Sequence, residues 1–152
     1  MKTTTEVRNQ LVSMIGSTIK IAQGYENDFD PAKVYNRYIK EITDDTSDVK
    51  YPKTFVCIAR GEQRRMIAGE INNLLSFLIM HVVKRPDEKT DVQILLDSAM
   101  RDFERFFEMN DTLGGFVQTL DLVEFVTDSG FLDPEGVMIM RVTTERFKYG
   151  GE

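Results

Sequence analysis

The chain has few of the residues on which metal and thiol chemistry depend. Among 152 residues there is one cysteine, Cys57, one histidine, His81, and no tryptophan. A single thiol cannot form an internal disulfide, and one thiol with one imidazole cannot build a Cys/His metal cage. We therefore expect no structural zinc, no other metal and no cofactor.

Phosphate-binding loops and long apolar runs are also missing. The sequence has no G-x-x-x-x-G-K-[ST] loop and no G-x-G-x-x-G turn, so it indicates no nucleotide site. The longest apolar run, Leu74 to Val83, is interrupted by Ser76 and His81, and it is far shorter than the roughly 20 residues of a membrane helix. Because Met1 to Arg8 is polar and charged, we expect no signal peptide, no membrane association and a reducing cytoplasm.

Basic residues are outnumbered by acidic ones. The chain has 19 Lys and Arg residues against 25 Asp and Glu residues, a formal net charge of −6. A surface that grips nucleic acid normally has a basic patch or stripe, which this balance disfavours. At 41% hydrophobic residues, the chain is long enough to bury one core, so we expect a single domain over residues 1–152.

Two segments have apolar residues at the three- and four-residue spacing of amphipathic helices. The first runs from about Thr4 to Ile21, with Thr4 or Thr5 as its N-cap. The second runs from about Thr90 to Asn110, with Asp91 near its positive end. We expect both helices to pack on one face of a sheet.

Two further segments predict a first strand pair. Residues Pro52 to Ala59 have the two faces of a strand, and Ile71 to Lys84 is the longest predicted strand. We expect the two to pair as a hairpin. The glycine-containing stretch Arg60 to Glu70 should form its long tip. The segment from Tyr25 to Tyr51 should be mostly loop, with one short edge strand at most.

A second strand pair is predicted between Asp111 and Tyr149. Its turn contains Asp128-Ser129-Gly130 and Pro134. On the first strand, one face should hold Val117, Thr119, Asp121, Val123 and Phe125, and the other Phe116, Gln118, Leu120, Leu122 and Val126; Met138, Met140 and Val142 should share a face of the second. The sequence thus predicts an α+β fold of order α-β-β-α-β-β, with about four antiparallel strands and two helices on one face.

The longest predicted strand is apolar on both faces. One face has Leu75, Phe77, Ile79, His81 and Val83, and the other has Leu74, Leu78, Met80 and Val82. A sheet with helices on one face is usually polar on the other. Another part of the chain could cover the second face, but two helices cover only one face. We therefore expect a neighbouring subunit to contact Leu74, Leu78, Met80 and Val82.

One charged cluster fits either a solvated turn or a contact. Arg60, Arg64 and Arg65 lie near Glu62 and Glu70 in the predicted hairpin tip. Arginine pairs well with carboxylates, so these three residues could bind an adjacent subunit or an acidic ring stacked below it. Both interpretations stay open.

No set of residues predicts catalysis. Asp128-Ser129-Gly130 matches the tripeptide of aspartic proteases, but those enzymes need a second aspartate in a matching lobe, and here a turn is expected. Glu41, Asp44, Asp45 and Asp48 lack the glycine and final glutamate of a calcium loop. We therefore expect no catalytic residue and no enzyme activity.

The order of elements resembles that of the tail terminator, or tail completion, proteins of tailed bacteriophages. The matching features are Asp28-Phe29 after the first helix, the hairpin tip Gly61 to Glu70, the helix end Asn110-Asp111-Thr112-Leu113-Gly114-Gly115, and the turn Thr127-Asp128-Ser129-Gly130 followed by Pro134-Glu135-Gly136. The resemblance covers nearly the whole chain and is architectural. It is specific in combination rather than feature by feature.

The resemblance implies a structural role in the virion. In that family, six copies form a ring that caps the tail tube, stops its polymerisation and offers the surface to which the head connector docks. The implied partners are other copies, the tail tube protein and a head completion or connector protein; the implied location is the neck end of the tail, after assembly in the host cytoplasm. DNA would pass through the lumen without specific binding, past polar residues such as Gln118, Glu124 and Glu145.

Two other classes of function remain. Another ring-forming virion protein, a head completion (neck adaptor) or tail tube protein, would share the antiparallel sheet and the oligomeric interface. A small acidic hydrolase or nuclease would need clustered carboxylates that hold a metal ion. The mass of the protein in solution separates the ring-forming classes from the hydrolase.

Overall fold

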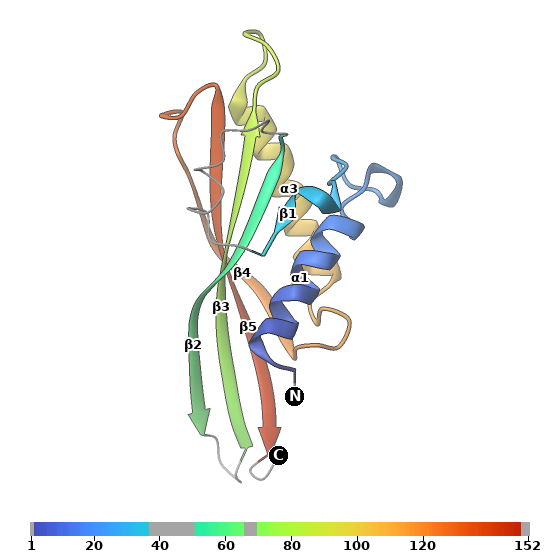
Figure 1. The fold of residues 1–152 in the computed structure, drawn as a ribbon, viewed down its shortest axis with the longest axis vertical. Coiled ribbons are helices and arrows are strands. Elements are labelled where there is room, and N and C mark those ends of the chain that lie inside the picture. The colour runs from blue at the N-terminus through green and yellow to red at the C-terminus, as the bar shows by residue number, and fades with distance from the viewer. Residues whose placement is uncertain (1, 37–50, 66–69, 150–152) are drawn as a thin grey trace.

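The computed structural model describes residues 2–36, 51–65 and 70–149 (Figure 1). The predicted α+β class is confirmed, since the described residues form two α-helices and a five-stranded sheet. The elements in chain order are α1 (Thr4–Thr18), two 3-10 turns, η1 (Ile21–Gln23) and η2 (Pro31–Lys33), then β1 (Val34–Tyr35), β2 (Lys53–Arg65), β3 (Glu70–Lys84), α3 (Val92–Met109), β4 (Thr119–Thr127) and β5 (Glu135–Tyr149).

The sheet has the strand order β1-β2-β3-β5-β4, with β1 parallel to β2 and all other pairs antiparallel. The prediction of about four strands, all antiparallel, is therefore wrong in detail. The fifth strand, β1, follows the turn η2. The Asp30 carboxylate caps η2 by accepting a hydrogen bond from the Ala32 amide, and Val34 then lies at the edge of β2, opposite Thr54. The short edge strand expected between Tyr25 and Tyr51 is β1.

The first hairpin is longer than predicted. β2 runs through Gly61 to Arg65, and Arg65 pairs with Ile71 on β3, so the residues expected in a long tip are largely strand. A bulge between Ile58 and Arg60 shifts the register ahead of the glycine. Gly61 breaks no pairing because it lies opposite Leu75 inside a continuous ladder, where tertiary pairing overrides the weak strand preference of glycine.

The helix ends follow side-chain capping. α1 begins with a capping box in which Thr3 and Glu6 satisfy one another's backbone amides, so the N-cap is Thr3 rather than Thr4 or Thr5. α1 ends at Thr18, short of the predicted Ile21, and gives way to η1. Asp91 caps α3 through the Gln93 amide, in agreement with its predicted place at the positive end of that helix.

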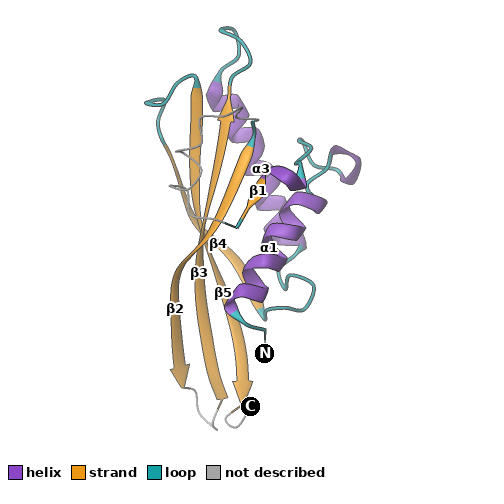
Figure 2. Cartoon of the chain, in the orientation of Figure 1, coloured by secondary structure: helices purple, strands orange, loops and turns teal. Residues whose placement is uncertain are grey.

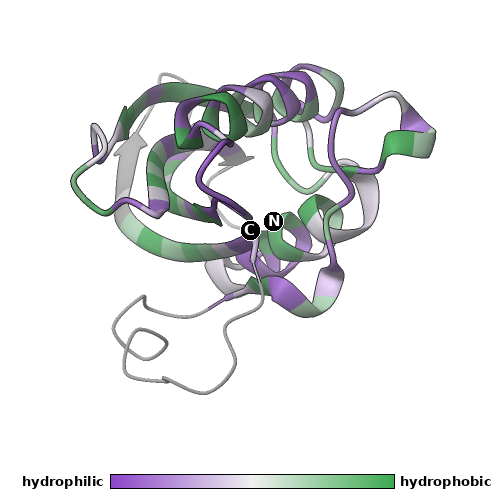
Figure 3. Cartoon of the chain, turned by 90° about the horizontal axis from the view of Figure 1, so that it is seen from above, coloured by the Kyte–Doolittle hydropathy of each residue, from purple (hydrophilic) through white to green (hydrophobic). Residues whose placement is uncertain are grey.

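The core lies between the helices and one face of the long, twisted sheet (Figure 2). Phe77, Ile79 and His81 of β3 are buried on this face. Both hydrophobic and hydrophilic stretches occur along the helices and strands (Figure 3). α3 and β5 approach closely at Gly136, where an added Cβ would lie 2.8 Å from the Val92 Cγ1 atom. Glycine is therefore required there for packing.

A bulge in β4 changes the predicted faces of that strand. The register with β5 shifts between Leu122 and Glu124, leaving Val123 as the extra residue. Phe125 then pairs with the buried Met140 and shares the helix-facing side with Leu122, contrary to the uninterrupted alternation that the sequence suggests. The predicted shared face of Met138, Met140 and Val142 is confirmed, since all three side chains belong to the core cluster that includes the helices.

Candidate functional site

The apolar residues predicted as a subunit interface lie on the face of β3 away from the helices. Leu74, Leu78 and Met80 are half-buried, whereas Val82 is buried. The strand is thus apolar on both faces, as its sequence predicts. Contact of these four residues with another subunit stays a prediction.

Part of this second face is covered by the chain itself. Phe55, Val82 and Val137 form a small buried cluster against which Tyr51 and Met80 pack. Further along β3, the neighbours on β5 opposite Ser76 and Leu74 are Thr143 and Glu145. The second face is therefore apolar at one end and becomes polar toward the end where β5 terminates.

The arginine cluster is placed only through its backbone. Arg60, Arg64 and Arg65 lie on β2, with Arg60 opposite Ser76 and Arg65 opposite Ile71. The conformations of these three side chains lie outside what the structure describes, so their contact to an adjacent subunit or an acidic ring stays a prediction.

The edge strand β4 and the turn after it expose large apolar side chains. β4 pairs only with β5 within the described residues, so its outer edge has unpaired backbone groups there. The exposed side chains are Val123, Phe125, Val126, Phe131 and Leu132, with exposed fractions from 48% to 91%. An open edge combined with exposed apolar residues is typical of a strand that contacts another protein.

An acidic groove of about 590 Å³ lies between α3 and β4. Its apolar lining includes Phe107 and Leu120, both buried in the core. Five carboxylate residues also line it, namely Glu104, Glu108, Asp111, Asp121 and Glu124, and no lining residue is basic. The groove extends the exposed β4 edge and gives it a negative charge.

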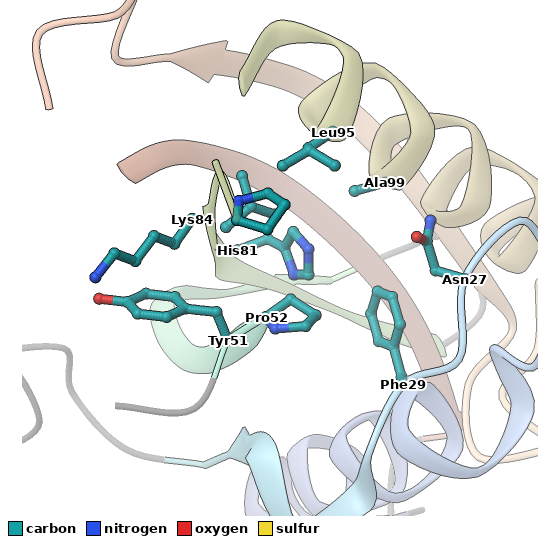
Figure 4. Close-up of a pocket in the computed structure, with 10 residues that line it drawn as sticks. Asn27, Phe29, Tyr51, Pro52, His81, Lys84, Leu95 and Ala99 are labelled. Atoms are coloured by element: carbon teal, nitrogen blue, oxygen red, sulfur yellow. The ribbon is translucent and has the colours of Figure 1, made fainter. Parts of the chain in front are cut away.

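A smaller pocket of about 210 Å³ opens between α3, the start of β2 and the end of β3 (Figure 4). Its labelled residues include Phe29, Tyr51 and Lys84, with His81 at its inner side. The Tyr51 hydroxyl donates a hydrogen bond to Glu135, and burial together with this bond raises the pKa of Tyr51 to about 12.

His81 is a structural residue of this pocket. Its ring stacks on Phe29 at 5.2 Å between centroids and meets Phe103 edge-on, while Nδ1 is 2.9 Å from the Thr54 hydroxyl. Burial lowers the pKa of His81 to about 3. The imidazole is therefore neutral at physiological pH, in keeping with the structural role inferred from its position in the strand.

Asp102 is an important polar residue that the sequence pattern did not reveal. It is buried on α3, and its carboxylate accepts hydrogen bonds from the Glu26 amide at 2.8 Å and from the Asn27 amide at 2.9 Å. The Asn27 side chain donates a third bond to the same carboxylate. These bonds fix the loop after η1 beside the pocket. An acidic residue within a helix gives no sequence signal of such a distant partner.

The residues that weakly resemble catalytic or metal-binding motifs have structural roles where the structure describes them. Asp128 accepts hydrogen bonds from the Leu132 and Val137 amides and closes the β4–β5 turn, as expected of a turn. Glu41, Asp44, Asp45 and Asp48 lie outside the described residues. Among the described residues no group of three or more His, Cys, Asp or Glu side chains could hold a metal ion.

Across the described ranges, every helix is too short or too polar to cross a membrane. Comparison of the chain with protein-family models and with curated proteins finds no match.

Proposed function

We propose that this protein is a structural component of a virion, a tail terminator whose copies form a ring on the tail tube of a bacteriophage. The observation that carries the proposal is the edge strand β4, which is open within the described residues and exposes Val123, Phe125 and Val126. The size of the ring, six copies, comes from the family that the sequence resembles. In this role the protein stops polymerisation of the tube, offers the head its joining surface and catalyses no reaction.

Strand polarity supports a ring. β4 and β2 run in opposite directions, since β3 is antiparallel to β2, β5 to β3 and β4 to β5. When copies are related by rotation about an axis parallel to the strands, the β4 edge of one copy meets the β2 edge of the next in antiparallel orientation. Within the described residues, β2 pairs with β1 only at Thr54 and Phe55, which leaves the rest of that edge for such a contact.

The second face of the sheet supports a further contact between copies, separate from the strand edges. Leu78 and Met80 are half-buried there, and the exposed Glu124 lies on this face beside Arg141. Contact with an adjacent copy would complete the burial of the apolar residues, and the polar end, including Glu145, would face the lumen.

The proposed location is the neck end of the tail, after assembly in the host cytoplasm. The proposed partners are the tube protein and a head completion or connector protein, with DNA passing through the ring. A head completion or tail tube protein would use the same strand edges. Mixing the protein with preformed tubes distinguishes a terminator from a tube protein, because a terminator caps the tubes whereas a tube protein lengthens them.

Mass in solution and negative-stain images test the ring. We expect a closed oligomer of the purified protein at high concentration, or rings on the ends of purified tail tubes. A monomer at every concentration, together with bare tube ends after mixing, contradicts the proposal.

Charge substitutions on the two faces of β3 locate the contact. Leu78→Asp should leave a folded monomer and abolish the ring, whereas the matched change Ile79→Asp should unfold the chain, because Ile79 is fully buried against the helices. The milder Leu78→Thr variant covers the case in which Leu78→Asp does not fold. An intact ring in folded Leu78→Thr and Leu78→Asp would remove this face from the interface.

DNA should not adhere to the assembled ring. A ring of six copies would carry six times the formal charge of −6 of one chain, which repels the phosphate backbone overall. We expect no mobility shift of duplex DNA at physiological salt. A salt-sensitive shift at micromolar protein would point to Arg60, Arg64 and Arg65 as a nucleic-acid contact. Lysine substitutions at Glu124 and Glu145 should slow DNA ejection if these residues line the lumen.

A further inference from the structure

Arg146 on β5 is a buried cation that lacks a described charge partner. Only 6% of the residue is exposed. One terminal guanidinium nitrogen donates a hydrogen bond to the Lys2 backbone carbonyl, and the buried Nε atom has no hydrogen-bond partner among the described residues. No ion pair with a carboxylate is found for it among the described residues, where the pairs involve Arg85, Arg101 and Arg141 instead.

A buried guanidinium without a counter-charge is energetically costly. Transfer of a charge from water is unfavourable unless hydrogen bonds and an opposite charge compensate for it. Burial lowers the pKa of Arg146, and none of the described acidic groups contributes to raising it. Arginine nevertheless stays protonated at neutral pH, so the cost is not removed by loss of the proton. The Arg146 guanidinium thus lacks an anion that would compensate for its burial.

Arg146 lines a pocket of about 400 Å³ between the start of α1, the α3–β4 connection and the end of β5. Lys2, Glu6, Gly115, Phe116, Val117 and Gln118 complete its lining, and we call this site the Arg146 pocket. The Lys2 ammonium lies 4.7 Å from the Phe116 ring centroid. The pocket therefore combines two cations with an apolar wall.

One acidic group shares the pocket but is already engaged. The Glu6 carboxylate accepts a hydrogen bond from the Thr3 amide at 2.7 Å as part of the capping box of α1. With Lys2 and Arg146, the charged lining sums to one net positive charge, which suits a single monovalent anion. Repulsion by Glu6 disfavours a more highly charged one.

We propose that the Arg146 pocket binds a carboxylate carried on an apolar or aromatic group, with Arg146 as the main anion partner. The planar guanidinium matches the two oxygens of a carboxylate, and Phe116 and Val117 provide the apolar contact. The proposal is independent of the ring, because the pocket is built within one chain.

Guanidinium NMR of ¹⁵N-labelled protein tests this site directly. The probe is N-acetylphenylalanine, and the control ligand is its neutral amide, at matched ionic strength. We expect a saturable shift of the Arg146 Nε–H signal with the carboxylate and none with the amide. Acetyl-Phe-Glu-Phe amide distinguishes a side-chain carboxylate from a chain end, according to which of the two probes binds more tightly.

Variants separate binding from folding. Arg146→Met should weaken binding of N-acetylphenylalanine by about tenfold or more, since it removes charge-assisted hydrogen bonds. Arg141→Met, on the same strand but in an exposed ion pair, should leave the affinity unchanged. Because Arg146→Met also removes an uncompensated buried charge, the free protein should be at least as thermally stable as the original.

Several results would overturn the proposal. These are the absence of a saturable shift, an equal shift with the amide, or unchanged affinity in folded Arg146→Met. Inorganic phosphate that binds as tightly as N-acetylphenylalanine would also overturn the assignment to a carboxylate. If Arg146→Met does not fold, Arg146→Lys replaces it, with reduced but measurable affinity expected because lysine keeps the charge and loses the paired geometry.

Discussion

The two faces of the sheet are both apolar in sequence, yet they are buried to different degrees. On the helix-facing side, Phe77, Ile79, Met140 and Val142 are fully buried in one continuous core. On the other side, a cluster of three buried residues covers only one end, and Leu78 among others is half-buried. Apolarity alone therefore does not tell a face that stabilises the fold from one that remains available for contact.

The difference has a simple cause in the arrangement of the helices. α1 and α3 lie on the same face, so among the described residues no helix covers the other face. Its exposed apolar area costs free energy in water unless another surface covers it. Substitutions on the first face should therefore change the free energy of unfolding, and those on the second should change association.

The largest effect should come from the aromatic centre of the helix-facing core. Phe103 is fully buried and contacts the rings of Phe29, His81 and Phe107. Phe103→Ala should lower the free energy of unfolding by about 3–5 kcal/mol, through lost burial and a cavity. Urea unfolding measures this loss. Leu78→Ala on the second face is the control, and it should lower the free energy of unfolding clearly less. Equal losses for the two variants would show that the two faces contribute alike to stability.

A smaller loss should follow from closing the contact between α3 and β5. Gly136→Val places atoms where Val92 and Leu96 already lie, so we expect a loss of up to about 3 kcal/mol in the same measurement. Gly61→Val is the matched control, because a Cβ there lies 3.4 Å from Leu75, an ordinary contact. Its effect should be neutral or favourable. A tolerated Gly136→Val would show that the helix can move away from the sheet.

Acid should weaken the helix-facing side through His81. The folded pKa of about 3 lies below the ordinary value of 6.5, so the unfolded chain binds an extra proton between these values. The contribution of neutral His81 to stability is therefore fully present above about pH 6.5, and it is lost as the pH drops toward 3. Between pH 7.5 and 5 the loss should reach about 2 kcal/mol.

The pH effect can be assigned by removing both partners of the buried hydrogen bond. The double variant His81→Phe/Thr54→Val leaves no polar atom of this pair unpaired. Its unfolding free energy should vary less between pH 7.5 and 5 than that of the original chain. The same slope in both proteins would mean that other groups cause the loss.

The periodicity of the sequence predicted most of the helices and strands. Local geometry explains the places where the structure differs from that prediction. The strong stripe of α3 and the apolar run of β3 predicted the correct types and nearly the correct ends of these elements, because burial of apolar side chains dominates there. The bulges near Ile58 and at Val123 depend on pairing with distant residues, so a local pattern does not reveal them. The same reason hid the parallel pairing of Val34 with Thr54.

The candidate sites were less predictable than the fold. The two-sided apolarity of β3 is visible in sequence, but the Arg146 pocket joins Lys2, Phe116 and Arg146 from three distant segments. An arginine near the end of a strand normally indicates a solvated position. Its burial becomes evident only once the start of α1 is placed beside β5.

The smallest effect on stability should come from the edge of the second face. Val126 on β4 is 59% exposed and pairs with the half-buried Ile139 of β5. Val126→Thr keeps the β-branched shape that strands favour, so the free energy of unfolding should change by less than about 0.5 kcal/mol.

If β4 is a contact between copies, the hydroxyl added by Val126→Thr is buried in the assembly, and the concentration needed for half-association, measured by light scattering, should rise severalfold. Ser13→Thr, at an exposed position of α1, provides a control outside the strand edge. Unchanged association in Val126→Thr would place the contact elsewhere, and a large loss of stability would show that this edge belongs to the folding core.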